Sequence, residues 1–296
     1  MLDDRFPTMG TVARVVRDAD GDVDVASLFA EIDRRLSRFD ATSDLSRLNA
    51  DPRPRVRAAP LLRAAVAAAL HAASVSGGLV DPTLLGALRR AGYGESRAHV
   101  SPASLSRGLR AAPRRHPARP DPAARWRAVV VDDRAGAVCR PPGLCLDLGG
   151  SVKGWAADLL AGRLERYGRC AVDCGGDLRL AAGGGAPWEV RVRNPFTGAV
   201  AHTFRVRAGA VATSGIDARL WERGEGDFAH HLIDPATGVP AWTGLVAATA
   251  LAPTALEAEA LAKAALLSGP AAGRRLLRAR YGGVLVLDDG TVDRVA

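Results

Sequence analysis

Residues 146–154 have the sequence LDLGGSVKG, which leads from a candidate strand through two glycines into a helix. We expect this helix over residues 152–167. Its apolar face consists of Trp155, Leu159, Leu160 and Leu164. Lys153 lies in the first turn, where backbone N–H groups can bind an anion. Lys153 and Lys263 are the only lysines among the 40 Lys and Arg residues of the chain. Since lysine offers a compact charge where arginine offers a planar fork, Lys153 is either an anion-binding ammonium or a surface lysine at a helix start.

The elements on either side of this stretch favour an α+β fold. Helices are predicted over residues 25–39, 58–74 and 255–267, with a further short helix after Thr83. A polar loop or short turn is predicted over residues 40–49. Strands are predicted over residues 11–16, 129–131, 145–148, 171–172, 178–180, 188–192, 203–206, 210–211, 230–233, 244–251 and 284–287. The strands come in hairpin-like groups rather than in strict βαβ order, which favours α+β over a doubly wound sheet.

Length and composition allow one domain or two, and we expect a single domain over residues 1–296. With 296 residues, 48% of them hydrophobic, the chain can bury a large core. Residues 95–122 are rich in Arg, Pro, Ala and Ser, and we interpret them as a partly helical excursion rather than a domain linker. The four cysteines form no C-x-x-C pair, so a zinc site is not expected and the thiols are expected to be reduced.

The charge of the chain favours an anionic small ligand over nucleic acid. The formal net charge is +8, but the arginines are spread along the chain apart from a cluster between Arg89 and Arg127, and no nucleic-acid motif accompanies them. No apolar run reaches the ~20 residues needed to span a bilayer. The first five residues are partly acidic and no apolar segment follows them, so we expect a cytoplasmic protein without a membrane span.

Four glycine-bearing corners are candidate ligand contacts, at residues 149–150, 175–177, 213–215 and 237–238. Each either lets the backbone approach a ligand or is an ordinary turn. None has the G-x-G-x-x-G or Walker A spacing of the standard nucleotide motifs, and Ser214 lacks the G-x-S-x-G setting of a hydrolase nucleophile. His230 and His231 begin the last corner. Strand alternation predicts that they point to opposite faces, so that one can transfer protons in a cleft; the alternative is a structural strand end and turn.

Taken together and in order, these segments resemble the FAD:protein FMN transferases, the ApbE-like flavin transferases. The matching motifs are MGT at 9–11, SDLSRLN at 43–49, VDPT at 80–83, DLGGSVKG at 147–154, GGD at 175–177, ATSG at 212–215 and HLIDPATG at 231–238. Each motif is short, and their number and order carry the resemblance. It implies a T-fold-like arrangement of mixed, mostly antiparallel sheets with packed helices.

The resemblance also implies a reaction. FAD is the substrate, its FMN half is transferred to a threonine or serine hydroxyl of an acceptor flavoprotein, and AMP leaves. Such a displacement at phosphorus requires charge neutralisation, in-line placement and deprotonation of a weakly acidic hydroxyl. Two alternatives remain open: a FAD pyrophosphatase that gives FMN and AMP, and a non-catalytic flavin-binding relative with a decayed metal site.

Carried over residue by residue, the resemblance implies roles for individual side chains. His231 would handle the proton, and Lys153 would offer its ammonium to the pyrophosphate or the flavin. The other implied FAD contacts are Met9, Phe39, Val80, Asp81, Asp147 and Leu232. Phe39 stands where the family often has tyrosine, an exchange that keeps stacking but loses a phenolic hydrogen bond.

The resemblance further implies magnesium, with the Gly150 carbonyl and the Glu259 carboxylate as ligands. The family's last helix normally reads ADxxxT, whereas residues 258–263 read AEALAK, so Lys263 replaces the hydroxyl. A protonated lysine cannot ligate Mg²⁺ and repels it at short range. Three interpretations remain: Glu259 still holds Mg²⁺ while Lys263 points aside, the Lys263 ammonium takes the place of the cation, or the two residues form an ordinary helix pair.

Overall fold

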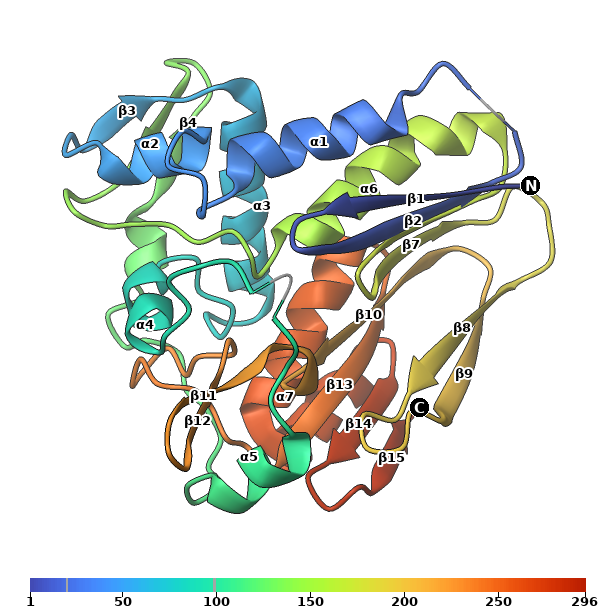
Figure 1. The fold of residues 1–296 in the computed structure, drawn as a ribbon. Helices are drawn as coiled ribbons and strands as arrows, with labels where there is room; N and C mark the ends of the chain where they lie inside the picture. Colours follow the sequence, from blue (N-terminus) through green and yellow to red (C-terminus); the bar gives the residue numbers. More distant parts are fainter. Residues whose placement is uncertain (20, 98–99) are drawn as a thin grey trace.

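The computed structural model describes residues 1–19, 21–97 and 100–296, and an eight-stranded sheet forms its centre (Figure 1). Along the sheet the strands are β1 (Leu2–Thr8), β2 (Thr11–Arg17), β6 (Cys170–Cys174), β7 (Asp177–Ala181), β10 (Gly209–Gly215), β13 (Leu245–Ala252), β14 (Gly283–Leu287) and β15 (Val292–Val295). Every neighbouring pair is antiparallel.

Three smaller sheets surround the central one, and their pairs are also antiparallel. They consist of β3 (Arg55–Arg57), β5 (Ala137–Cys139) and β4 (Val130–Asp132); of β8 (Trp188–Arg193) and β9 (Val200–Val206); and of β11 (Leu220–Gly224) and β12 (Asp227–His230). The prediction of an α+β fold with mostly antiparallel sheets is therefore confirmed.

The helices pack against the central sheet and against one another. Helix α6 (Val152–Leu164) lies on β6 and β7, and α7 (Ala255–Arg278) lies on β10 and β13 (Figure 1). The others are α1 (Val25–Leu36), α2 (Asp44–Ala50), α3 (Pro60–Val75), α4 (Leu85–Arg90) and α5 (Leu105–Ala111), with short 3₁₀ turns at Arg125–Ala128, Glu165–Tyr167 and Asp217–Arg219. Among the described residues, no helix combines the length and the apolarity that crossing a bilayer would need.

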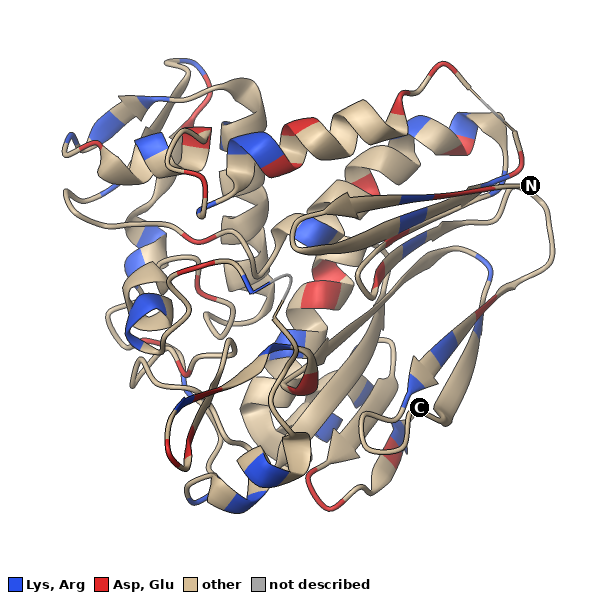
Figure 2. Cartoon of the chain, viewed as in Figure 1, with Lys and Arg blue, Asp and Glu red and all other residues tan. Residues whose placement is uncertain are grey.

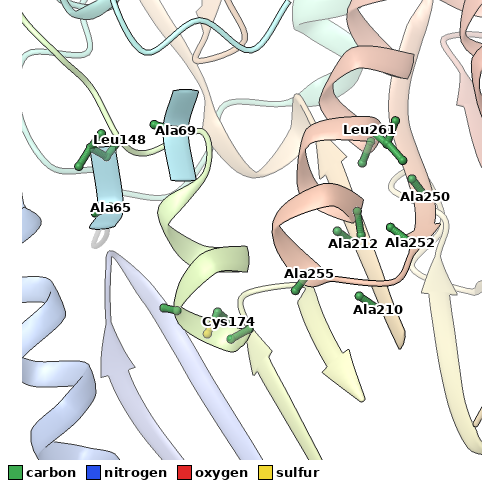
Figure 3. Close-up of a cluster of buried hydrophobic side chains, with 14 of the residues drawn as sticks. Ala65, Ala69, Leu148, Cys174, Ala210, Ala212, Ala250, Ala252, Ala255 and Leu261 are labelled. Atoms are coloured by element: carbon green, nitrogen blue, oxygen red, sulfur yellow. The ribbon is translucent and has the colours of Figure 1, made fainter. Parts of the chain in front are cut away.

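Small side chains allow α7 to lie close to the sheet. Ala210 and Ala212 of β10 and Ala250 and Ala252 of β13 are buried beside α7 (Figure 3). A large aliphatic residue at these positions would hold the helix farther from the strands. This alanine-lined contact fixes α7 against the sheet, and with it the side chains that α7 directs towards α6.

Three local predictions were wrong, two of them because a side chain satisfies the backbone in a way that periodicity does not show. Residues 40–49 are not only a loop, since Ser43 caps α2 by accepting a hydrogen bond from the Ser46 N–H at 3.0 Å. Residues 145–148 are not a strand; Asn49 instead exchanges two hydrogen bonds with the backbone of Leu146, at 2.7 and 2.8 Å. Strand β12 ends at His230 rather than continuing to Ile233.

The excursion at residues 95–122 contains α5, and its residues 98 and 99 lie outside the described residues. Arg115 anchors this segment: its guanidinium donates to the Leu109 carbonyl at 2.9 Å and pairs with Asp288 at 2.8 Å. Farther along, the Ala118 N–H donates to the Leu267 carbonyl of α7 at 2.8 Å. The segment is therefore packed on the body of the protein at several points.

Candidate active site

Four charged side chains from three separate segments meet where α6 begins beside α7. They are Lys153 at the start of α6, Asp177 at the start of β7, and Glu259 and Lys263 one turn apart on α7. Figure 2 shows acidic and basic bands on α7 close to the beginning of α6, near the middle of the molecule. We refer to these four residues as the charged cluster. It lies inside the protein rather than on its surface.

The carboxylate of Glu259 is the centre of the cluster. Its Oε1 lies 2.7 Å from the Lys263 ammonium and 3.5 Å from the Lys153 ammonium, and its Oε2 accepts a hydrogen bond from the Gly154 N–H at 2.9 Å. Lys153 also pairs with Asp177. The side chain of Glu259 is 0% exposed and that of Asp177 is 1% exposed. Because water does not reach these carboxyl groups, only the neighbouring ammonium groups and hydrogen bonds stabilise their charge.

The two carboxyl groups respond differently to this environment. Burial acts to raise the pKa of Glu259, but the ammonium groups of Lys263 and Lys153 outweigh burial and lower the pKa. Burial and the charge of Glu259 raise the pKa of Asp177 to about 7, against the opposing effect of Lys153. Oδ1 of Asp177 is also buried without a hydrogen-bond partner among the described residues. Glu259 is therefore the carboxyl group that stays ionised.

The magnesium ion that the family resemblance implies does not fit these side chains. Both oxygens of Glu259 are already engaged, and the cation nearest to them belongs to Lys263. No group of three or more His, Cys, Asp or Glu side chains in the described part of the chain could hold a metal. A magnesium ion held by the predicted ligands, Gly150 and Glu259, would thus have to compete with the Lys263 ammonium for the same carboxylate oxygen.

His231 lies beside the charged cluster. Burial, together with the charges of His230, Lys263, Arg219 and Lys153, lowers the pKa of His231 well below its usual range. Nδ1 of the ring is buried and has no hydrogen-bond partner among the described residues. The imidazole is consequently neutral at physiological pH, with a ring nitrogen free to accept a proton.

The prediction that strand alternation directs His230 and His231 to opposite faces does not apply, because β12 ends at His230. His230 is completely buried, its Nδ1 accepts from the Leu232 N–H at 3.3 Å, and its ring meets the edge of Trp242 with centroids 4.8 Å apart. His231 is half-buried. Leu232, an implied ligand contact, is 4% exposed and belongs to the main core.

Asp147 does not extend freely towards a ligand, since Arg38 holds it. The guanidinium of Arg38 lies 2.5 Å from the Asp147 carboxylate, which also accepts from the Gly149 N–H at 3.0 Å. The same guanidinium stacks on the rings of Phe39 and Tyr93, at 4.2 and 4.6 Å from their centroids. Phe39 is 40% exposed, so this stack presents an aromatic face to solvent.

The VDPT motif lies against both the glycine turn of residues 149–150 and α7. Val80 packs with Ala260 of α7, and a β-carbon at Gly150 would lie 3.3 Å from a methyl group of Val80. The Pro82 carbonyl accepts from the Asp147 N–H at 2.7 Å. Asp81 turns back on its own loop, accepting from the N–H and the hydroxyl of Thr83 at 2.7 and 2.6 Å, while its other oxygen is buried without a partner among the described residues.

Met9 forms the tip of the β1–β2 turn, with a φ of 47° that is unusual for a residue other than glycine. The carbonyl of the next residue, Gly10, accepts a hydrogen bond from Arg219 at 2.8 Å. Arg219 is also one of the charges that lower the pKa of His231, so this arginine connects the turn with the histidine.

Sequence reasoning identified Lys153, Glu259, Lys263 and His231, and it marked the GGD corner that contains Asp177, but it missed three residues around them. The missed residues are Arg38, Tyr93 and Arg219. Arg38 was indicated only by its position next to Phe39. Tyr93 and Arg219 carry no local signal, because only the tertiary fold brings them to the site.

Comparison with known proteins gives one consistent family. The chain matches the ApbE family over residues 9–287. A FAD:protein FMN transferase of Escherichia coli (strain K12) is 36% identical over 143 residues, which cover 46% of this chain and 40% of that protein. A FAD:protein FMN transferase of Haemophilus influenzae is 24% identical over 288 residues, covering 88% of this chain and 79% of that protein.

The crystal structure of the ApbE protein from Thermotoga maritima has the same architecture, with a TM-score of 0.78 and 25% identity. The superposition covers 99% of this chain and 96% of the other. The match with the Escherichia coli protein thus spans less than half of that relative's length, whereas the family model and the fold extend over nearly the whole chain. The chain belongs to the ApbE family.

Proposed function

We propose that the protein transfers the FMN half of FAD to a threonine or serine hydroxyl of an acceptor flavoprotein, with release of AMP. The observation that carries this proposal is the position of a neutral histidine beside two ammonium groups at the start of a glycine-preceded helix. The FAD:protein FMN transferase names of the sequence relatives support the choice of substrate.

In the proposed reaction the acceptor oxygen attacks the phosphorus atom that carries the FMN half. A new P–O bond forms, the bridging P–O bond to AMP breaks, and AMP leaves with that electron pair. His231 accepts the hydroxyl proton at a ring nitrogen, and Lys153 stabilises the charge on the pyrophosphate oxygens. When the negative phosphates bind near Lys153 and Lys263, they offset the positive charges that lower the pKa of His231, so the histidine becomes a stronger base in the complex.

The remaining side chains bind and orient FAD in this proposal. Phe39 offers an exposed aromatic face for stacking, held in place by Arg38, which Asp147 holds in turn. Met9 would provide an apolar contact from the tip of the β1–β2 turn, whereas Leu232, which is 4% exposed, would pack beside the site from the main core. Val80 packs on α7 and against the glycine turn of residues 149–150, and the unpartnered oxygen of the neighbouring Asp81 would accept a hydrogen bond from a donor of the ligand.

One incubation distinguishes the transferase from its two alternatives. The purified chain is mixed with FAD and with an acceptor flavoprotein that carries the target hydroxyl, and a matched acceptor with that residue replaced by alanine is the control. Covalent flavin fluorescence on the first acceptor alone, with equimolar AMP, is the expected result. Release of FMN and AMP with either acceptor would instead identify a pyrophosphatase, and intact FAD throughout would identify a binding protein.

A further inference from the structure

We infer that the ammonium group of Lys263 takes the place of a divalent cation in this chain, so that phosphoryl transfer here does not depend on a metal ion. The inference concerns how the proposed transferase works and therefore rests on that proposed function. It follows from the geometry around Glu259 and from the absence of a fit for magnesium described above.

The surroundings of the Glu259 carboxylate do not suit a magnesium ion. Mg²⁺ lies about 2.0–2.1 Å from its oxygen ligands and prefers oxygens on all sides. Oε1 of Glu259 instead has the Lys263 nitrogen at 2.7 Å, with the Lys153 nitrogen at 3.5 Å. An ion bound to Oε1 would lie next to two positive charges. Oε2 is turned towards the backbone and occupied by the Gly154 N–H.

Their burial distinguishes Glu259 and Lys263 from an ordinary Glu–Lys helix pair. Exposed Glu–Lys pairs one turn apart contribute little, and either partner can be lost at small cost. Here the side chain of Glu259 is 0% exposed and that of Lys263 is 9% exposed. A pair so deeply buried costs free energy to desolvate, and the same volume filled by apolar groups would be at least as stable. Its presence is therefore better explained by a need for positive charge at this point.

The charge of Lys263 acts on His231 as well as on Glu259. Lys263 lies close enough to His231 for its charge to affect the imidazole, as does Lys153. The two ammonium groups therefore flank both the carboxylate and the proton-accepting side chain. A bound pyrophosphate near His231 would lie within reach of both lysines, whose two positive charges face one ionised carboxylate, Glu259, and the Asp177 carboxyl group with its pKa raised to about 7.

The experiment compares the wild-type chain with a variant that restores the family sequence, Glu259→Asp combined with Lys263→Thr. Binding of Mn²⁺ alone is measured by the loss of the free-ion EPR signal, and FAD binding and FMN transfer are measured with EDTA and with added Mg²⁺. We expect the wild-type chain to bind no Mn²⁺ at the cluster. We expect its turnover in EDTA to stay within about twofold of the turnover with Mg²⁺, which corresponds to a free-energy difference smaller than RT. We expect the double variant to bind one Mn²⁺ and to need Mg²⁺ for turnover.

FAD binding by a Lys263 variant and Mn²⁺ binding by the wild-type chain test the role of the ammonium group further. Lys263→Met removes the charge without creating a ligand, and we expect it to weaken FAD binding about tenfold, as one lost charge-assisted contact would, without rescue by Mg²⁺. If the wild-type chain binds one Mn²⁺ per molecule and loses FAD binding in EDTA, the inference is wrong. Should the double variant fail to fold, Mn²⁺ binding by the wild-type chain still decides. Mn²⁺ binding is independent of transfer, so a chain that binds FAD but never transfers FMN would contradict only the proposed function.

Discussion

Gly154 of α6 lies so close to Ala255 of α7 that a β-carbon on the glycine would be 2.5 Å from the Ala255 carbonyl oxygen. The contact is reinforced by Asp158, whose two carboxylate oxygens accept from the N–H groups of Ala255 and Leu256 at 2.8 and 2.9 Å. The two helices thus meet at their first turns, which is what brings Lys153 within reach of Glu259.

Replacing that glycine is expected to separate the helices. Gly154→Ala should lower the free energy of unfolding by about 1–3 kcal/mol, the usual cost of overpacking, and should weaken FAD binding because Lys153 and Glu259 move apart. Urea denaturation and a FAD titration measure the two effects. Gly162→Ala is the matched control, since it lies on the same helix with nothing within 4 Å of the added carbon; it should be neutral or stabilising by up to about 1 kcal/mol.

The proposed role of His231 makes a separate prediction about rates. His231→Ala should reduce kcat by about 10²–10⁴-fold, the range for loss of a positioned base, while the affinity for FAD stays nearly constant. Single-turnover measurements with saturating FAD and acceptor show this directly. His202→Ala, on the separate β8–β9 sheet, should leave kcat unchanged. Wild-type turnover in the His231 variant would eliminate it as the proton acceptor.

The ion pair of Lys153 and Asp177 should show strong coupling in a double-mutant cycle. Lys153→Met leaves a carboxyl group that is 1% exposed without its cation, and should cost about 3–5 kcal/mol of stability. Combining it with Asp177→Leu removes the unpaired group and should recover most of that loss. Urea denaturation of both single variants and the double variant gives the coupling free energy, and simple additivity would mean that the two side chains do not interact in solution.

The buried His230 should make the protein less stable in acid. Burial lowers its pKa from 6.5 to about 3, so between these values the unfolded chain takes up a proton that the folded chain excludes. The free energy of unfolding should therefore fall by about 1.4 kcal/mol for each pH unit below 6.5 from this group alone. Asp177, with its raised pKa, acts in the opposite direction over part of this range.

The contribution of His230 is isolated by comparing the wild-type chain with His230→Asn, which retains an acceptor for the Leu232 N–H. Its stability should decline less steeply between pH 6.5 and pH 4 than that of the wild-type chain. Equal slopes would show that the folded protein admits a proton at His230.

Much of the site could be predicted because its residues lie in short continuous motifs. The spacing of Glu259 and Lys263 gives one helical turn directly, and the glycines before Lys153 mark the start of α6. What could not be predicted are contacts between distant motifs. The pairing of Asn49 with Leu146 and of Arg38 with Asp147 each joins residues about 100 positions apart, and no local pattern states which partner a polar side chain will choose.

The predictions of the short strands and turns were wrong for a related reason. Two hydrogen bonds with Asn49 satisfy the backbone of Leu146 as a neighbouring strand would, and periodicity does not distinguish this arrangement from sheet. The strand β1 (Leu2–Thr8) was not predicted either, since its charged and exposed residues hide the alternation expected of an edge.

The contacts of Glu259 with residues 105 positions earlier have a consequence for the protein during its own synthesis. A nascent chain whose synthesis has not yet reached α7 contains the glycine turn and His231 but neither Glu259 nor Lys263. The charged cluster therefore cannot assemble until α7 has been synthesised and has docked on the sheet and on α6.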